Sequence, residues 1–222
     1  MSAAPAHVLS TAGEIKLLRV LTTLRTAETS LLVLPALVVW LCSYLAGFAW
    51  ELAAWALVMA AFAGFMAWSR HRLLKDELAM PAPEMLARWR VIVTVNATLY
   101  GALWTVPLMM VDRPVPPAFG ILMYVMLCGI TAGTAVYVSV VIHAFIGFLC
   151  GMWLPAMIAL HWVFPDLWPM LVPSSLLFCY VNLKHARTLH GFMVRHVVLE
   201  EDSAELARRF EKARDDAEEA LS

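Results

Sequence analysis

Apolar residues of this chain gather into six long runs that are separated by short polar connections. A helix needs about 20 apolar residues to cross the hydrocarbon core of a bilayer, and helical hydrogen bonding satisfies its backbone amides there. The runs cover residues 31–49, 52–68, 91–111, 117–138, 142–164 and 167–183, the second and sixth being short. The pattern therefore predicts an all-α membrane protein, built as a bundle of six transmembrane helices.

A different pattern begins after the sixth run. Selected positions recur there at alternating intervals of three and four residues, which is the heptad period of a coiled coil. No proline follows Pro173, so we expect the sixth helix to continue through this seam. Identical chains would present identical heptads, which predicts a parallel homodimer; a solvated helix that docks elsewhere is the alternative. The seam positions are Leu189, Phe192, His196, Leu199, Ser203, Leu206, Phe210, Ala213, Ala217 and Ala220.

The basic residues predict the orientation of the bundle. Lys and Arg lie before the first run, between the second and third runs, and after the sixth, whereas only Arg113 lies in a connection on the other side. Loops rich in Lys and Arg stay in the cytoplasm, so both termini are expected there. The outer connections are too short to form an extracellular domain. Any stimulus should therefore arrive within or through the bilayer, at its rim, or from the cytoplasm.

Three segments are expected along the chain. Residues 1–30 form a cytoplasmic leader, residues 31–183 the membrane domain, and residues 184–222 a juxtamembrane helix with the coiled coil. We expect residues 69–90, the one long connection, to lie along the inner lipid surface as a strap. The leader has apolar residues at helical spacing, which suits a helix on the lipid surface, although a disordered tail is the alternative. These residues are Ile15, Leu17, Leu18, Leu21 and Leu24.

Composition excludes several classes of protein. With 62% hydrophobic residues, 15% charged residues and a mean hydropathy of +0.75, the chain is too apolar for an ordinary soluble domain. Its four cysteines fall in different runs without a CxxC pair, which favours buried thiols. His143 and His161 lie 18 residues apart on one helix, too far to share a metal ion. We expect no catalytic residue, metal or cofactor, and no nucleic-acid partner.

A set of polar and aromatic residues within the runs is the candidate ligand site. Asn96, Tyr100 and Trp104 follow at steps of four and share one helix face. If this face meets the polar faces of neighbouring helices, an aromatic pocket with a few directional polar groups results, suited to a lipophilic small molecule. The alternative is interhelical hydrogen bonding that only packs the bundle. The candidate residues are Asn96, Tyr100, Trp104, Thr131, Thr134, Trp153 and Ser174.

Glycines predict where two helices approach each other closely. Gly129 and Gly133 form a GxxxG motif in the fourth run, and Gly147 and Gly151 form another in the fifth. Gly133 and Gly147 lie equally far from the turn between these runs. We therefore expect the two motifs to face each other and to let the fourth and fifth backbones come close.

The chain from residue 87 onward resembles a known family. The carrying stretches are ARWR at 87–90, ATLYGALW at 97–104, GITAGTA at 129–135 and ARDDAEEALS at 213–222. They are similar to the membrane sensor region of bacterial sensor histidine kinases, often hybrid ones. The resemblance implies an inner-membrane location and a two-component signalling role, with a dimerisation and phosphotransfer domain and an ATP-binding domain downstream.

The parts that such a kinase uses for catalysis do not occur in this sequence. It has no histidine in a phosphoacceptor box, no glycine-rich ATP motif and no GGDEF motif. The resemblance therefore implies the input module of a longer receptor, without kinase activity of its own. Similar membrane regions also precede diguanylate cyclase domains. A small transporter or a membrane scaffold is a further alternative, although a transport path would usually carry charges well inside the runs.

Overall fold

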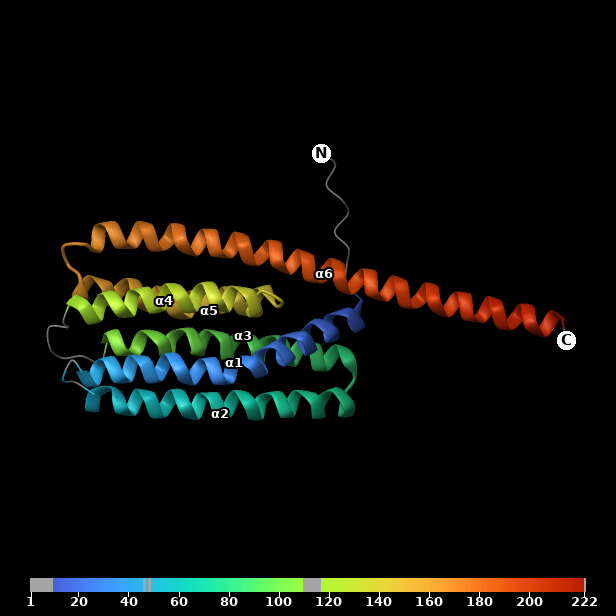
Figure 1. Cartoon of the computed structure of the whole chain (residues 1–222), viewed down its shortest axis with the longest axis horizontal. Coiled ribbons are helices and arrows are strands. Elements are labelled where there is room, and N and C mark those ends of the chain that lie inside the picture. The colour runs from blue at the N-terminus through green and yellow to red at the C-terminus, as the bar shows by residue number, and fades with distance from the viewer. Residues whose placement is uncertain (1–9, 46, 48, 110–116, 222) are drawn as a thin grey trace.

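The computed structural model describes residues 10–45, 47, 49–109 and 117–221. All six of its elements are helices, and these residues contain no strand, which confirms the all-helical prediction. Figure 1 shows the helices packed side by side, with the end of the last one projecting far beyond the others. The helices are α1 (Thr11–Leu45), α2 (Ala49–Ala79), α3 (Ala82–Met109), α4 (Pro117–Val138), α5 (Ile142–Val163) and α6 (Trp168–Leu221).

Four stretches of helix are long and apolar enough to cross a membrane. They cover Leu52–Glu77, Ala82–Met109, Pro117–Val138 and Ile142–Val163. Their apolar surface gives the chain the character of a membrane protein. In α1 the described side chains form a shorter apolar stretch, Pro35–Leu45, because those of residues 22–34 lie outside the described part. The spans predicted at residues 31–49 and 167–183 stay predictions.

The closest helix pair is α3 with α5, which make the most extensive contact in the bundle. A Cβ atom built on Gly151 would lie 2.1 Å from the backbone oxygen of Thr98. One built on Gly101 would lie 2.4 Å from the backbone oxygen of Phe148. These distances leave no room for a side chain, so glycine on both helices lets the two backbones touch.

The predicted facing of the two GxxxG motifs is wrong. Gly147 and Gly151 of α5 lie against Thr94 and Thr98 of α3, whereas Cβ atoms on Gly129 and Gly133 of α4 would have no atom within 4 Å. Distance from a turn fixes how far along a helix a residue lies. It does not fix the rotation of the helix about its axis, and that rotation decides which partner a motif meets.

The predicted strap is a helical hairpin instead. Residues 69–79 continue α2, the chain turns at residues 80–81, and α3 begins directly afterwards. Leu73, Met85 and Leu86 are buried in the bundle core and do not lie on a lipid surface. Pro83 falls in the first turn of α3, where the missing amide hydrogen is not needed for the helix.

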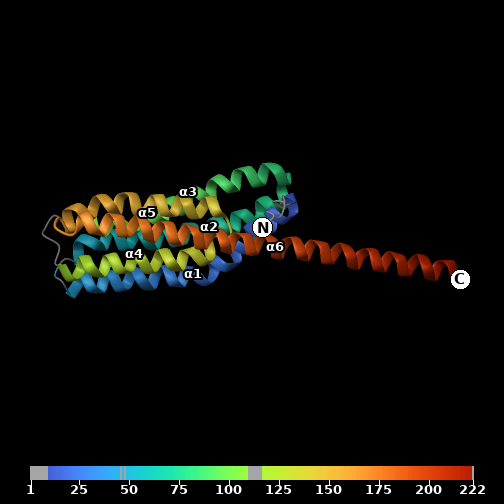
Figure 2. The ribbon, with the colours of Figure 1, turned by 90° about the horizontal axis from the view of Figure 1, so that it is seen from above.

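The described part of the leader is helical from Thr11 onward, as predicted, and its first apolar side chains pack against protein. The hydroxyl oxygen of Ser10 accepts a hydrogen bond from the backbone amide of Gly13 at 2.9 Å, which caps the start of α1. Leu17, Leu18 and Leu21 are then buried at 5%, 3% and 0% exposure, so this part of α1 packs into the core. The side chain of Leu24 lies outside the described residues. Figure 2 shows the start of α1 near the point where α6 leaves the bundle.

We predict that Gly151→Ala destabilises the protein by roughly 1–3 kcal/mol, because the added methyl group overlaps backbone atoms of α3. Gly129→Ala on α4 is the matched control, since its methyl group enters open space and alanine favours a helix. Thermal unfolding in detergent, followed by circular dichroism, measures both. Equal unfolding temperatures for the two variants would contradict the close α3–α5 contact.

Candidate functional site

The face of α3 that carries Asn96, Tyr100 and Trp104 is buried, but it belongs to an aromatic core. The Tyr100 ring stacks on Phe62 of α2, with centroids 6.2 Å apart, and on Phe148 of α5 at 5.7 Å. The rings of Trp104 and of Trp55 on α2 meet edge to face, with centroids 5.7 Å apart. This cluster therefore joins three helices around the α3–α5 contact. Aromatic pairs at such distances stabilise a core beyond the area that they bury.

Two buried indoles in this cluster differ in their hydrogen bonds. Nε1 of Trp55 donates to the backbone oxygen of Leu103 at 2.7 Å. Nε1 of Trp104, on a fully buried residue, has no hydrogen-bond partner in the described part of the chain. A buried donor without a partner costs stability. Trp104 is thus the one place in the aromatic core where a polar group is not satisfied among the described side chains.

A cluster of polar side chains around Trp153 connects α4, α5 and α6. Nε1 of Trp153 donates to the hydroxyl oxygen of Thr131 at 3.0 Å, and that hydroxyl in turn donates to the backbone oxygen of Leu127 at 2.8 Å. The Tyr124 hydroxyl lies 3.1 Å from that of Ser175. Tyr124 also presents its ring to Trp153, at a centroid distance of 6.0 Å.

The predicted ligand residues therefore do not form one pocket. Tyr100 and Trp104 contact α2 and α5, and Asn96 lines a groove between α2 and α3, while Thr131 and Trp153 lie between α4 and α5. Ser174 is exposed and donates to its own helix at Met170, whereas the neighbouring Ser175 makes the contact across helices. Thr134 is buried on α4. The contacts around Trp153 are those of interhelical packing, and the ligand role of these residues stays a prediction.

The leader forms ion pairs with two other helices at the polar end of the bundle. Arg19 pairs with Glu77 near the end of α2, and Glu14 pairs with Arg90 near the start of α3. Both pairs lie beside the buried leucines of the leader. The first turns of α1 are thus attached to the α2–α3 hairpin by apolar packing and by charge.

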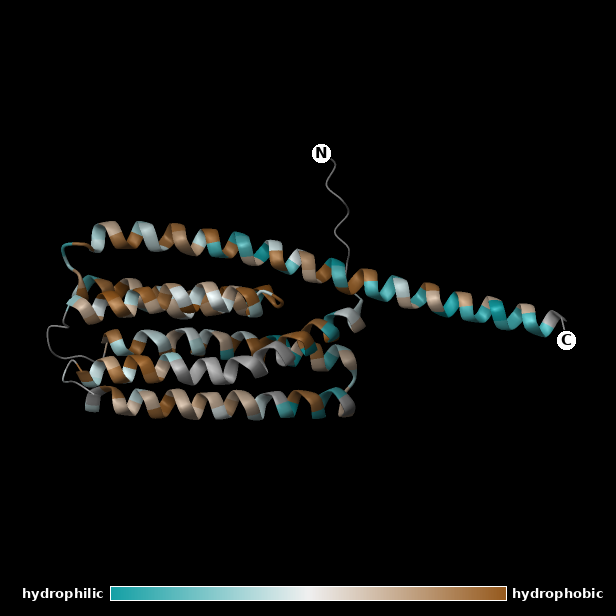
Figure 3. Cartoon of the chain, viewed as in Figure 1, coloured by the Kyte–Doolittle hydropathy of each residue, from teal (hydrophilic) through white to brown (hydrophobic). Residues whose placement is uncertain are grey.

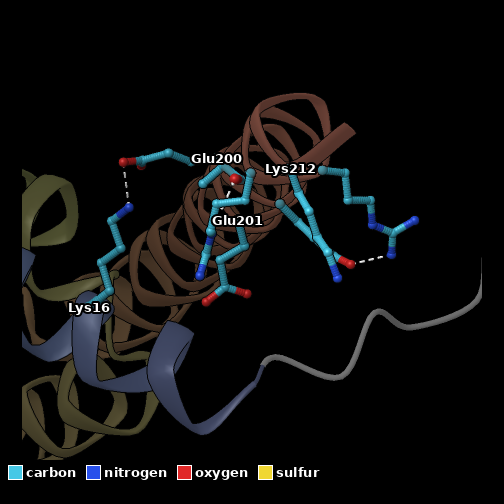
Figure 4. A pocket seen from close by; sticks show the side chains of 8 residues that line it. Lys16, Glu200, Glu201 and Lys212 are labelled. Atoms are coloured by element: carbon cyan, nitrogen blue, oxygen red, sulfur yellow. Dashed lines mark hydrogen bonds and ion pairs between the residues drawn. The ribbon is translucent and has the colours of Figure 1, made fainter. Parts of the chain in front are cut away.

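The leader also reaches α6 where that helix leaves the bundle. Lys16 pairs with Glu200 (Figure 4). The Ser10 hydroxyl donates to the carboxylate of Glu201 at 2.9 Å. We call the leader and its partners the collar, which consists of Ser10, Glu14, Lys16, Arg19, Glu77, Arg90, Glu200 and Glu201. The hydrogen bond and charge of Lys16 lower the pKa of Glu200 below its ordinary value. The contact is therefore fully formed above the ordinary carboxyl pKa and weakens as pH falls through the lowered one.

Where it passes the collar, α6 has one held face and one open face. On the held face, Ala186 and Val197 are buried at 0% and 3% exposure. The ring nitrogen Nδ1 of His190 also lies 3.0 Å from the backbone oxygen of Val140, in the turn between α4 and α5. This face is fixed to the bundle and the leader together.

The open face carries the predicted heptad seam. Leu189 is half-buried at the bundle, and His196 and Ser203 are exposed. Phe192, Leu199, Leu206 and Phe210 are 60%, 66%, 55% and 75% exposed. Figure 3 shows hydrophobic turns recurring among hydrophilic ones along the projecting part of α6. The seam is thus a row of apolar side chains on a helix that has left the apolar bundle, on a different face from Ala186 and Val197.

Sequence reasoning identified the seam but missed the collar. The acidic and basic residues of the leader looked like an ordinary polar flank, and nothing in their spacing names distant partners. Comparison of the chain with protein families, with curated proteins and with solved structures found no match. No group of three metal-ligating side chains occurs in the described part of the chain.

The two buried indoles provide a matched test of the aromatic core. Trp55→Phe removes a hydrogen bond and leaves the Leu103 oxygen without its donor, whereas Trp104→Phe removes a donor that has no partner. We expect Trp55→Phe to lower the free energy of unfolding by about 1 kcal/mol more than Trp104→Phe does. Chemical unfolding of both variants in detergent measures this difference. A larger loss for Trp104→Phe would show that its indole nitrogen is satisfied.

Proposed function

We propose that this chain is the membrane-embedded input module of a bacterial sensor histidine kinase, with both ends in the cytoplasm. The observation that carries the proposal is α6. One helix runs from Trp168 to Leu221, is held by the bundle and the collar as far as Glu201, and carries the apolar side chains of the predicted heptad seam exposed. Such a helix can pass a change of tilt or rotation from the membrane to a domain beyond it.

A second copy of the chain is the proposed partner of the seam. Outside the bundle, the apolar side chains of the seam are exposed, and a row of this kind is typical of an interaction surface. Parallel copies would bury it as a coiled coil. His196 and Ser203 would weaken the layers nearest the membrane, where two packings of similar free energy would let the helix pair switch.

The proposed stimulus is a lipophilic or membrane-accessible molecule. The predicted topology leaves only short connections on the outer side of the membrane. The described helices also expose many apolar side chains around the bundle, so a molecule dissolved in the lipid reaches most of its surface. The resemblance of the sequence to the input regions of sensor histidine kinases supports this role. The downstream domain proposed here is the catalytic region of that same family.

We predict that cysteines at Leu199 or Leu206 crosslink two copies in membranes. Both side chains lie on the open face, and a parallel coiled coil brings each beside its counterpart. A cysteine at Arg208, which lies outside the seam, is the matched control and should not crosslink. Disulfide formation with a mild oxidant, read on a non-reducing gel, measures the yields. Equal yields at all three positions would contradict a defined seam.

A chimera tests whether α6 transmits a signal. We propose to fuse the chain after Ser222 to the catalytic region of a well-characterised histidine kinase and to insert one to seven residues at the junction. If rotation or register of the helix pair sets the output, autophosphorylation should vary with the insertion and return at seven residues, one heptad. Activity that is independent of the insertion would argue against transmission through α6. Fusion to a diguanylate cyclase domain tests the alternative output in the same way.

A further inference from the structure

A groove between α2 and α3 is charged at one end and apolar along the rest of its length, as a phospholipid is. It has a volume of about 380 Å³ and is separate from the heptad seam and from the Trp153 group. Apolar side chains line most of it: Phe65 and Trp68 from α2, and Val91 and Val95 from α3, which are 42%, 56%, 63% and 49% exposed. These side chains face outward from the bundle, where lipid is the solvent of a membrane protein.

Two guanidinium groups stand at the polar end of this groove. Arg72 of α2 and Arg88 of α3 lie at similar distances from the hairpin turn, so both helices bring a positive charge to the same level. Arg72 also lies over the ring of Trp68, 5.9 Å from its centroid, which holds the guanidinium at the groove.

A single carboxylate faces these two charges. Asp76 lies 3.6 Å from Arg88 and 4.0 Å from Arg72, and it accepts a hydrogen bond from Nε1 of Trp89 at 3.2 Å. One negative charge cannot neutralise two positive ones, and both arginine side chains remain about half exposed. The end of the groove therefore carries an excess positive charge, complementary to a phosphate.

Asn96 lies at the other end of the groove. This residue is 5% exposed and follows Arg88 by eight residues, about 12 Å of helix, so it lies past Val91 and Val95. The length of the groove next to the arginines is therefore lined by apolar side chains.

We propose that the α2–α3 groove binds an anionic phospholipid. Its phosphate lies at Arg72 and Arg88, and an acyl chain lies along Phe65, Val91 and Val95. The charged end and the apolar length of the groove follow each other as the phosphate and the acyl chain do in a phospholipid. Anionic lipids are attracted to clusters of basic residues at the membrane surface, and the apolar groove adds a place for the chain. The site does not depend on the signalling role of α6.

Native mass spectrometry of the full chain in detergent, titrated with palmitoyl-oleoyl phosphatidylglycerol, tests the headgroup end. The double variant Arg72→Gln/Arg88→Gln should bind this lipid at least about tenfold more weakly. The matched control Arg187→Gln/Arg195→Gln removes two exposed arginines from α6, outside the groove, and should bind as the original protein does. Phosphatidylcholine, which has no net charge, should bind weakly to all of them. Equal affinities for the two double variants would overturn the proposal.

A second variant tests the groove while the arginines stay in place. Val95→Trp fills the apolar part and should also weaken phosphatidylglycerol binding, whereas Val125→Trp, at an exposed position of α4, should not. Unfolding temperatures confirm that each variant is folded. Unchanged binding by Val95→Trp would show attraction to the surface without occupancy of the groove, and would overturn the site. Displacement of the lipid by excess inorganic phosphate would show that the site binds an anion without binding the acyl chain. This result would overturn the phospholipid site as well.

Discussion

The rest of the structure depends on the backbone contact between α3 and α5. Gly101, Gly147 and Gly151 bring the two helices so close that neither can rotate without a clash. Once this rotation is fixed, Tyr100 and Trp104 must point towards α2 and α5, and Trp153 must point towards α4. In lipid there is no water to drive helices together, so close van der Waals packing of this kind supplies much of the association.

The collar connects the bundle to α6 and so fixes the direction in which α6 leaves the bundle. Exposed ion pairs contribute little each, because water and salt screen them. The buried leucines of the leader supply the main attachment, and the charges of Glu14, Lys16 and Arg19 select which helices the leader meets. The held face of α6 is thereby turned to the bundle and the seam to the outside. A movement of the leader relative to α6 would rotate the seam. In the proposed input module, this rotation would carry the signal from the bundle to the end of α6.

The sequence predicted the helices better than it predicted the contacts between them. Apolar runs indicated the helices, and the absence of proline after Pro173 correctly indicated one continuous α6. Heptad spacing indicated a seam whose side chains are open in the single chain, although the coiled coil itself stays a prediction. Helical spacing in the leader indicated a helix but could not show whether lipid or protein covers it.

Rotation and long-range pairing account for the errors. The GxxxG motif of α5 met threonines of α3 instead of glycines of α4, because spacing along a helix does not specify its rotation. Ser175 makes the contact across helices, while Ser174, one residue earlier, points away. The ion pairs and the serine hydrogen bond of the collar join residues that are 58 to 191 positions apart. No local pattern encodes such pairs.

The central claim is that the leader is part of the bundle and holds α6. Hydrogen–deuterium exchange of the full chain in lipid nanodiscs tests this claim most directly. The amides of residues 14–21 should exchange as slowly as those in the middle of α3, because they are helical and their apolar side chains are buried. Lys16→Glu should speed exchange in both the leader and residues 193–201 of α6, since the two segments share a contact. Fast exchange of the leader in the unmodified protein would contradict the account.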